Sequence, residues 1–62
     1  MDKTEEQILQ QIMLDSRVRL ITISQKLRLP RRTIEDAVAR LKSKGVLKRI
    51  GPDKGGRWEI VE

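Results

Sequence analysis

Basic side chains and their spacing are the features of this 62-residue sequence that could do chemistry. Arg31 and Arg32 stand just before an apolar pattern of helical period, and Lys54 and Arg57 flank two consecutive glycines. Arginine and lysine bind phosphate groups, and arginine can also engage the edge of guanine through two donors. The chain has no histidine, cysteine or tyrosine, so the commonest general base and the usual zinc ligands are missing. We therefore expect a binding protein rather than an enzyme, with no cofactor and no metal.

The positive charge is concentrated in the middle of the chain. Fourteen basic and nine acidic residues give a net charge of +5. Residues 16–49 carry a net charge of +9, with Glu35 and Asp36 as their only acidic residues, whereas residues 1–15 carry −3. Such a block is typical of a surface that attracts a polyanion, nucleic acid before membrane. The alternative is a solvated surface without a partner, which small soluble domains often have. No apolar run reaches the roughly 18 residues of a membrane span, so we expect a cytoplasmic protein.

The elements that must position these side chains follow from periodicity and punctuation, and they form one domain over residues 1–62. Thr4 and Gln7 have capping-box spacing and predict a helix over 5–14. The β-branched run 18–21 predicts a short strand, and a second capping box at Thr22 predicts a helix over 23–28. The apolar arc of residues 34, 37, 38 and 41 predicts a helix over 31–44, closed by Gly45. Turn residues at 51–56 between two β-compatible runs predict a hairpin over 46–61.

The predicted order is helix, strand, helix, helix, strand, strand, an α+β fold in which a small antiparallel sheet accompanies three helices. A short helix, a tight break and a longer helix with a basic start form a helix-turn-helix, and the hairpin after it forms a wing. The expected core consists of apolar residues on the inward faces of these elements: Ile8, Ile12, Ile23, Leu27, Ile34, Val38, Leu41, Leu47, Trp58 and Ile60.

Two stretches of the sequence resemble known families. The segments 21–27 (ITISQKL) and 31–35 (RRTIE) look like a bacterial or archaeal winged helix-turn-helix domain, a resemblance that covers nearly the whole chain. The tail from Leu41 to Ile60 is similar to the C-terminal winged helix of Schlafen-related, AlbA-type ATP-binding transcriptional regulators. The second resemblance implies a DNA-binding module that is cut from, or related to, a longer protein. Two residues depart from the usual pattern: Arg28 stands where such turns carry glycine, and Pro30 stands where they carry a serine cap.

The expected function is a DNA-binding module of a transcriptional regulator, with the helix 31–44 in the major groove and the wing 51–57 on the backbone of double-stranded DNA. A homodimer is compatible with the sequence, although no dedicated dimerisation helix is evident. The alternative is a winged-helix protein-interaction or dimerisation module. Reading of RNA or Z-form nucleic acid is a third option. The candidate contact residues lie in the turn, on the outward arc of the third helix and at the wing: Arg28, Arg31, Arg32, Thr33, Arg40, Lys54 and Arg57.

Several of these residues also have structural interpretations. Arg32, Asp36 and Arg40 are spaced i, i+4, i+8 and could form an ion-pair ladder on the surface of the helix. Trp58, the only aromatic residue, is expected in the core rather than stacked on a base, because a chain this short needs its apolar area. Gly55 and Gly56 either allow close approach to a ligand or simply make the turn.

Overall fold

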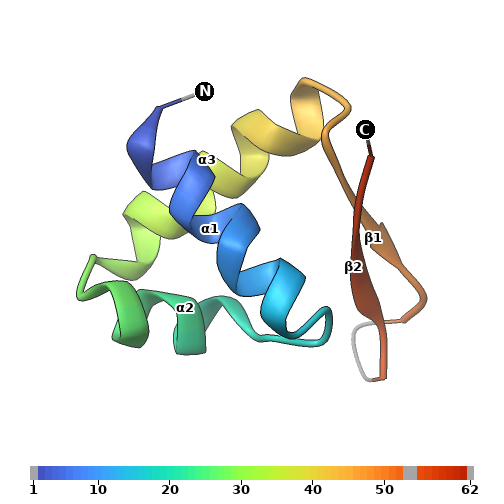
Figure 1. Cartoon of the computed structure of the whole chain (residues 1–62), viewed down its shortest axis with the longest axis horizontal. Helices are drawn as coiled ribbons and strands as arrows, with labels where there is room; N and C mark the ends of the chain where they lie inside the picture. Colours follow the sequence, from blue (N-terminus) through green and yellow to red (C-terminus); the bar gives the residue numbers. More distant parts are fainter. Residues whose placement is uncertain (1, 53–54, 62) are drawn as a thin grey trace.

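A computed structural model describes residues 2–52 and 55–61, which form three helices and one antiparallel hairpin (Figure 1). Helix α1 spans Lys3–Leu14, α2 spans Leu20–Leu27 and α3 spans Arg31–Ser43, followed by strands β1 (Leu47–Ile50) and β2 (Arg57–Ile60). Helix α1 packs against both α2 and α3, and the hairpin stands beside the helices (Figure 1). The predicted winged helix-turn-helix architecture is confirmed, with α2 and α3 as the helix-turn-helix and the hairpin as the wing.

The start of α1 differs from the prediction. Asp2, not Thr4, is the N-cap: its carboxylate accepts a hydrogen bond from the Glu5 backbone N–H at 2.8 Å. The Glu5 carboxylate in turn accepts from the Asp2 backbone N–H at 3.5 Å, which completes a capping box. Aspartate is as good an N-cap as threonine or better, so the helix begins at Lys3, two residues before the predicted start.

The strand predicted at 18–21 is wrong. Val18 and Arg19 have no regular secondary structure, and α2 already begins at Leu20, with no side-chain cap from Arg19. A helix forms here because Leu20, Ile23 and Leu27 lie three and four residues apart and all pack in or against the core. A strand would not place these three residues on one side. The predicted capping box at Thr22 therefore falls inside the helix. The sheet has two strands, with residues 47–50 paired in antiparallel register with 60–57.

The core lies between the three helices and the inner face of the hairpin. Of the ten predicted core residues, Leu27 and Ile60 are only partly buried but pack against the core, and the other eight are buried. The buried apolar set is Ile8, Ile12, Val18, Ile23, Ile34, Ala37, Val38, Leu41, Leu47 and Trp58. This core fixes α3 so that one long side of the helix remains exposed. None of the helices in the described part of the chain is long and apolar enough to cross a membrane.

The structure shows how the turn accommodates Arg28 and Pro30, the two residues that depart from the usual pattern. Arg28 adopts the left-handed conformation, with φ 57° and ψ 42°, as the C-cap of α2. Its backbone N–H and that of Leu29 both reach the Ser24 carbonyl, which satisfies the end of the helix. Pro30 is the N-cap of α3 and provides no side-chain hydrogen bond, as its chemistry requires. Helix α3 ends at Ser43, one residue before the predicted end, and Gly45 follows with φ 76°.

Candidate nucleic-acid interface

A basic cleft of about 920 Å³ lies between the N-terminal end of α2, the side of α3 and the wing. Five basic side chains line it, and no acidic residue is among the described residues of its walls. Three of the five are arginines in the loop before α2, at its N-cap and at the start of α3, and the others come from the last turn of α3 and from β1: Arg17, Arg19, Arg31, Lys42 and Arg49. A concave surface lined by one sign of charge focuses the field and attracts a polyanion.

Trp58 forms part of the wall of this cleft and is anchored on two sides. Its side chain is buried, with 6% of the residue exposed, as predicted for a core residue. The indole Nε1–H donates to the Val18 carbonyl at 3.2 Å, and the Trp58 backbone N–H donates to the Ser16 carbonyl at 2.7 Å. The ring is therefore fixed against the loop that leads into α2. These hydrogen bonds take the place of the third strand that the sequence predicted.

Two cations of the cleft lie over the Trp58 ring. Lys42 Nζ is 5.4 Å and Arg49 Cζ is 4.9 Å from the ring centroid, both within cation–π range. Lys42 comes from the last turn of α3, whereas Arg49 lies on β1 directly opposite Trp58 in the sheet register. The ring thus links α3 to the wing.

The first turn of α3 presents its arginines to solvent. Arg31 and Arg32 are both exposed, and Thr33 is half-buried. Arg31 pairs with Glu35 at 3.5 Å, but both side chains are at least half exposed, so the pair contributes little. Arg32 has no ion pair with any residue that the structure describes, and the predicted ladder with Asp36 and Arg40 is not formed. The N-terminus of α3 has no side-chain cap, and it places the positive end of the helix dipole next to these residues.

Arg40 is on another side of α3, where it packs against α1. Its guanidinium lies 3.4 Å from an Asp2 carboxylate oxygen and 3.8 Å from a Glu5 oxygen. Lys44 Nζ also pairs with Glu5, at 2.8 Å, and Glu5 is almost fully buried. The hydrogen bond from the Glu5 backbone N–H lowers the pKa of Asp2, and the Arg40 charge lowers it further. The structure therefore does not bring Arg40 together with Arg31 at the cleft.

The remaining predicted contacts lie in the turn and at the wing. Arg28 is exposed in the turn between α2 and α3, and Arg57 is exposed at the start of β2. Lys54 lies outside the described residues. Gly56 is buried in the wall of the cleft, and a Cβ there would come within 2.8 Å of the Ile50 carbonyl oxygen. Close packing of the hairpin on itself therefore requires this glycine, whatever the wing binds.

Sequence reasoning missed four of the five basic residues of the cleft: Arg17, Arg19, Lys42 and Arg49. All four belong to the +9 block. Arg17 and Arg19 were missed because the sequence predicted a strand at 18–21, whereas the structure has a loop and the start of α2 there. A signal for Arg49 was present, because a six-residue loop over 51–56 sets this residue directly across from Trp58. No comparable local signal places Lys42 beside the same ring.

Comparison with known proteins agrees with this geometry. The family model of the winged helix-turn-helix DNA-binding domain matches residues 1–48, which comprise all three helices and the first two residues of β1. Searches of curated proteins and of solved structures found no match. The matched region covers most of the chain and coincides with the helices that carry the fold. The chain belongs to the winged helix-turn-helix DNA-binding family.

Proposed function

We propose that this chain is the DNA-binding module of a transcriptional regulator, which inserts α3 into the major groove and sets its wing on the sugar–phosphate backbone. The observation that carries the proposal is the cleft beside α3, with five basic residues and no acidic residue among its described walls. We propose the regulatory role because the sequence of residues 41–60 resembles the winged helix of Schlafen-related, AlbA-type regulators.

Helix α3 would provide base contacts from its first turn. The major groove is about 12 Å wide and admits an α-helix. Arg32 is exposed and has no ion-pair partner among the described residues, so its guanidinium is available for two hydrogen bonds to a guanine. Arg31 and Thr33 flank it, where the positive end of the helix favours phosphate oxygens.

The backbone contacts would come from the cleft and the wing. Arg17 lies in the loop before α2 and Arg19 is its N-cap, Arg28 lies in the turn, and Arg57 is the first residue of β2. Lys54 in the wing loop stays in the proposed set because of its place in the sequence alone. Arg40 is left out, because moving it to DNA would break its pairs with Asp2 and with the buried Glu5.

The test is the salt dependence of binding to a labelled random duplex, followed by fluorescence anisotropy. If about five of the basic residues each neutralise one phosphate, the logarithm of the association constant falls with that of the salt concentration with a slope of about −4 to −5. Arg19→Gln should weaken binding to all duplexes and reduce the slope by about 1.

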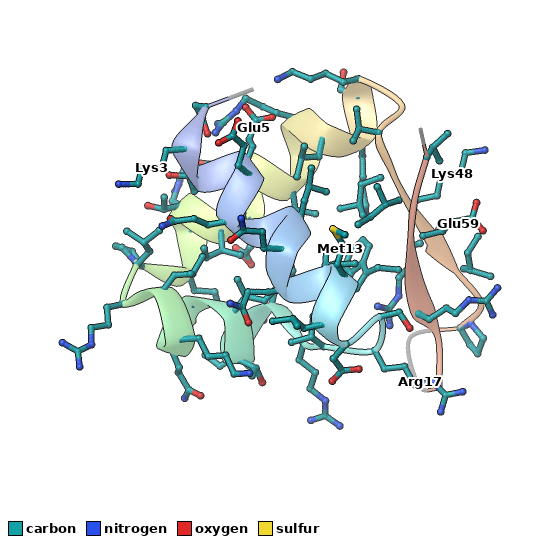
Figure 2. All side chains as sticks on the ribbon, in the orientation of Figure 1. Lys3, Glu5, Met13, Arg17, Lys48 and Glu59 are labelled. Carbon is teal, nitrogen blue, oxygen red and sulfur yellow. The ribbon has the colours of Figure 1, made fainter. Side chains whose placement is uncertain are left out.

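The matched control is Lys3→Gln, which removes the same charge at the opposite end of α1 from the loop that carries Arg17 (Figure 2). We expect the control to bind like the wild-type protein. Arg32→Gln, in a selected site, should instead relax preference at one or two base pairs. Absence of wild-type binding to duplex at low salt would refute the proposed function and would leave the protein-interaction alternative.

A further inference from the structure

We propose that Asp36 is a specificity-determining residue of α3, whose carboxylate accepts a hydrogen bond from the N4 amino group of a cytosine in the major groove. The inference rests on the proposed function and deepens it, because it names a base preference of the DNA site. It also gives a role to an acidic side chain that attraction of a polyanion alone does not require.

Asp36 lies on the side of α3 that is turned away from the core. A helix turns by about 100° per residue, so residues 32, 36, 39 and 43 share the arc opposite the buried residues 34, 37, 38 and 41. All four residues of this outward arc are exposed: Arg32, Asp36, Ala39 and Ser43. Two of them are small, so the helix can approach the floor of a groove closely, and the arginine and the aspartate are the side chains that reach furthest from it.

The outward arc carries no net charge, whereas both neighbouring sides of α3 carry cations. Arg31 and Lys42 line the cleft on one side. Arg40 and Lys44 lie on the other side, where carboxylates at the start of α1 neutralise them. Phosphates attract positive side chains, but base edges present donors and acceptors without net charge. An arc with one cation and one anion therefore suits base edges better than it suits phosphates.

The Asp36 carboxylate has no ion pair and no side-chain hydrogen bond with any residue that the structure describes. Arg32 and Arg40 lie one turn away on either side, and neither pairs with it. A carboxylate only accepts hydrogen bonds, and the phosphates of any duplex repel it. A donor on a base edge is therefore needed to offset this repulsion.

The major groove contains two amino donors of this kind, cytosine N4 and adenine N6. Adenine presents its N7 acceptor beside N6, and that acceptor repels a carboxylate. Guanine and thymine present only acceptors there, together with the thymine methyl group. Cytosine is therefore the base that Asp36 favours.

The spacing of Arg32 and Asp36 determines how far apart their bases lie. Four residues of an α-helix rise by about 6 Å, which is close to two base steps of about 3.4 Å each. Arginine engages the O6 and N7 atoms of guanine through two donors. We therefore expect the preferred site to hold a guanine for Arg32 and a cytosine for Asp36 within about two base pairs of each other.

Selection from a pool of randomised duplexes, followed by sequencing, tests this assignment with the Asp36→Asn variant. The substitution keeps the shape of the side chain and breaks no described contact, so we expect the fold to be retained. Asparagine pairs with N6 and N7 of adenine, so the selected base should change from cytosine to adenine. On the site that the wild-type protein selects, affinity relative to random duplex should fall by about five- to 150-fold, the usual effect of one mismatched base pair.

Binding to random duplex should change in the opposite direction. Asp36→Asn removes a negative charge close to the phosphates, so its affinity for random duplex should rise by about two- to fivefold at low salt. The matched control is Glu59→Gln, which removes the same charge from β2 at a position that points away from the helices (Figure 2). We expect the control to select the same sites as the wild-type protein, with the same ratio of affinities.

The outcomes separate this inference from the function on which it rests. Absence of wild-type binding to random duplex at low salt would overturn the proposed function and the role of Asp36 with it. Wild-type binding combined with selection of the same bases by Asp36→Asn, or with no base preference at all, would overturn the role of Asp36 and leave the proposed function intact. An equal fall in the affinity ratio for Glu59→Gln would also overturn it, because the effect would then depend on total charge only.

Discussion

Substitution of Arg28 separates backbone strain from charge at a single position. Arg28 is the only non-glycine residue with positive φ in the described part of the chain, and the hydrogen bonds at the end of α2 fix it there. A left-handed non-glycine residue costs about 1–2 kcal/mol, whereas the freedom of glycine in the unfolded chain costs about 0.5–1 kcal/mol. We therefore expect Arg28→Gly to raise the free energy of unfolding by about 0.5–1 kcal/mol. For a domain of this size that corresponds to a rise in Tm of about 2–8 °C.

The matched control for this prediction is Arg28→Ala, which removes the same charge but keeps a Cβ in the left-handed conformation. Thermal unfolding followed by circular dichroism should rank the glycine variant above the wild-type protein and above the alanine variant. Duplex binding should weaken equally in both variants, with the salt slope reduced by about 1 if Arg28 contacts a phosphate. Equal melting temperatures for the two variants would refute the strain argument, and wild-type binding in both would remove Arg28 from the interface.

Three further substitutions test the core, the first helix cap and the wing. Ile34→Ala should lower the free energy of unfolding by about 2–5 kcal/mol, measured by chemical denaturation, because Ile34 is fully buried. The pKa of Asp2 is lowered by its hydrogen bond from the Glu5 N–H, so its stabilising effect is complete above pH 3.8 and is lost as pH falls through the lowered pKa. Asp2→Asn should keep the cap and lose less stability in acid than the wild-type protein. Gly56→Ala should destabilise the hairpin, seen as faster amide exchange in the strands, since the added Cβ would meet the Ile50 carbonyl oxygen at 2.8 Å.

Local sequence signals predicted the parts of the fold that depend on long, regular patterns. The apolar arc of α3 is one example: residues 34, 37, 38 and 41 are all buried. The change of period at Gly45 is another, because this residue adopts positive φ and the following chain forms the hairpin. In both cases every local preference agrees with the tertiary arrangement, so the sequence alone was sufficient.

The segment 18–21 is a region whose structure the local sequence signals did not predict. Three aliphatic residues among these four fit a short strand or the first turn of a buried helix, and periodicity cannot distinguish the two at this length. The choice is made by contacts distant in sequence. The Trp58 backbone N–H donates to the Ser16 carbonyl and its indole N–H donates to the Val18 carbonyl, while Leu20 packs against the core as part of α2.

The candidate site was predictable as a charged block but not residue by residue. The net charge of +9 over residues 16–49 predicted a basic surface, and the cleft has one. Arg40 and Lys44 belong to this block but do not line the cleft. They pair instead with Glu5, a buried residue of α1 that lies more than 30 positions away in the sequence. Spacing within α3 favoured Asp36 as the partner of Arg40, and the observed partners have no signature within that helix.

The acidic residues at the start of the chain explain why exposed positive charge is concentrated on one side of α3. Asp2 and Glu5 neutralise Arg40 and Lys44 on the side of α3 that faces α1, while Arg31 and Lys42 face the cleft on another side of the same helix. Without those carboxylates, α3 would present positive charge on both sides and would attract DNA in more than one orientation. In the proposed function, the internal pairs would disfavour one of these orientations, and long-range attraction would then draw DNA toward the cleft, the wing and the first turn of α3. If DNA binds at the proposed interface, the segment with a net charge of −3 contributes to recognition through the charge that it removes from the surface, with no need to contact DNA itself.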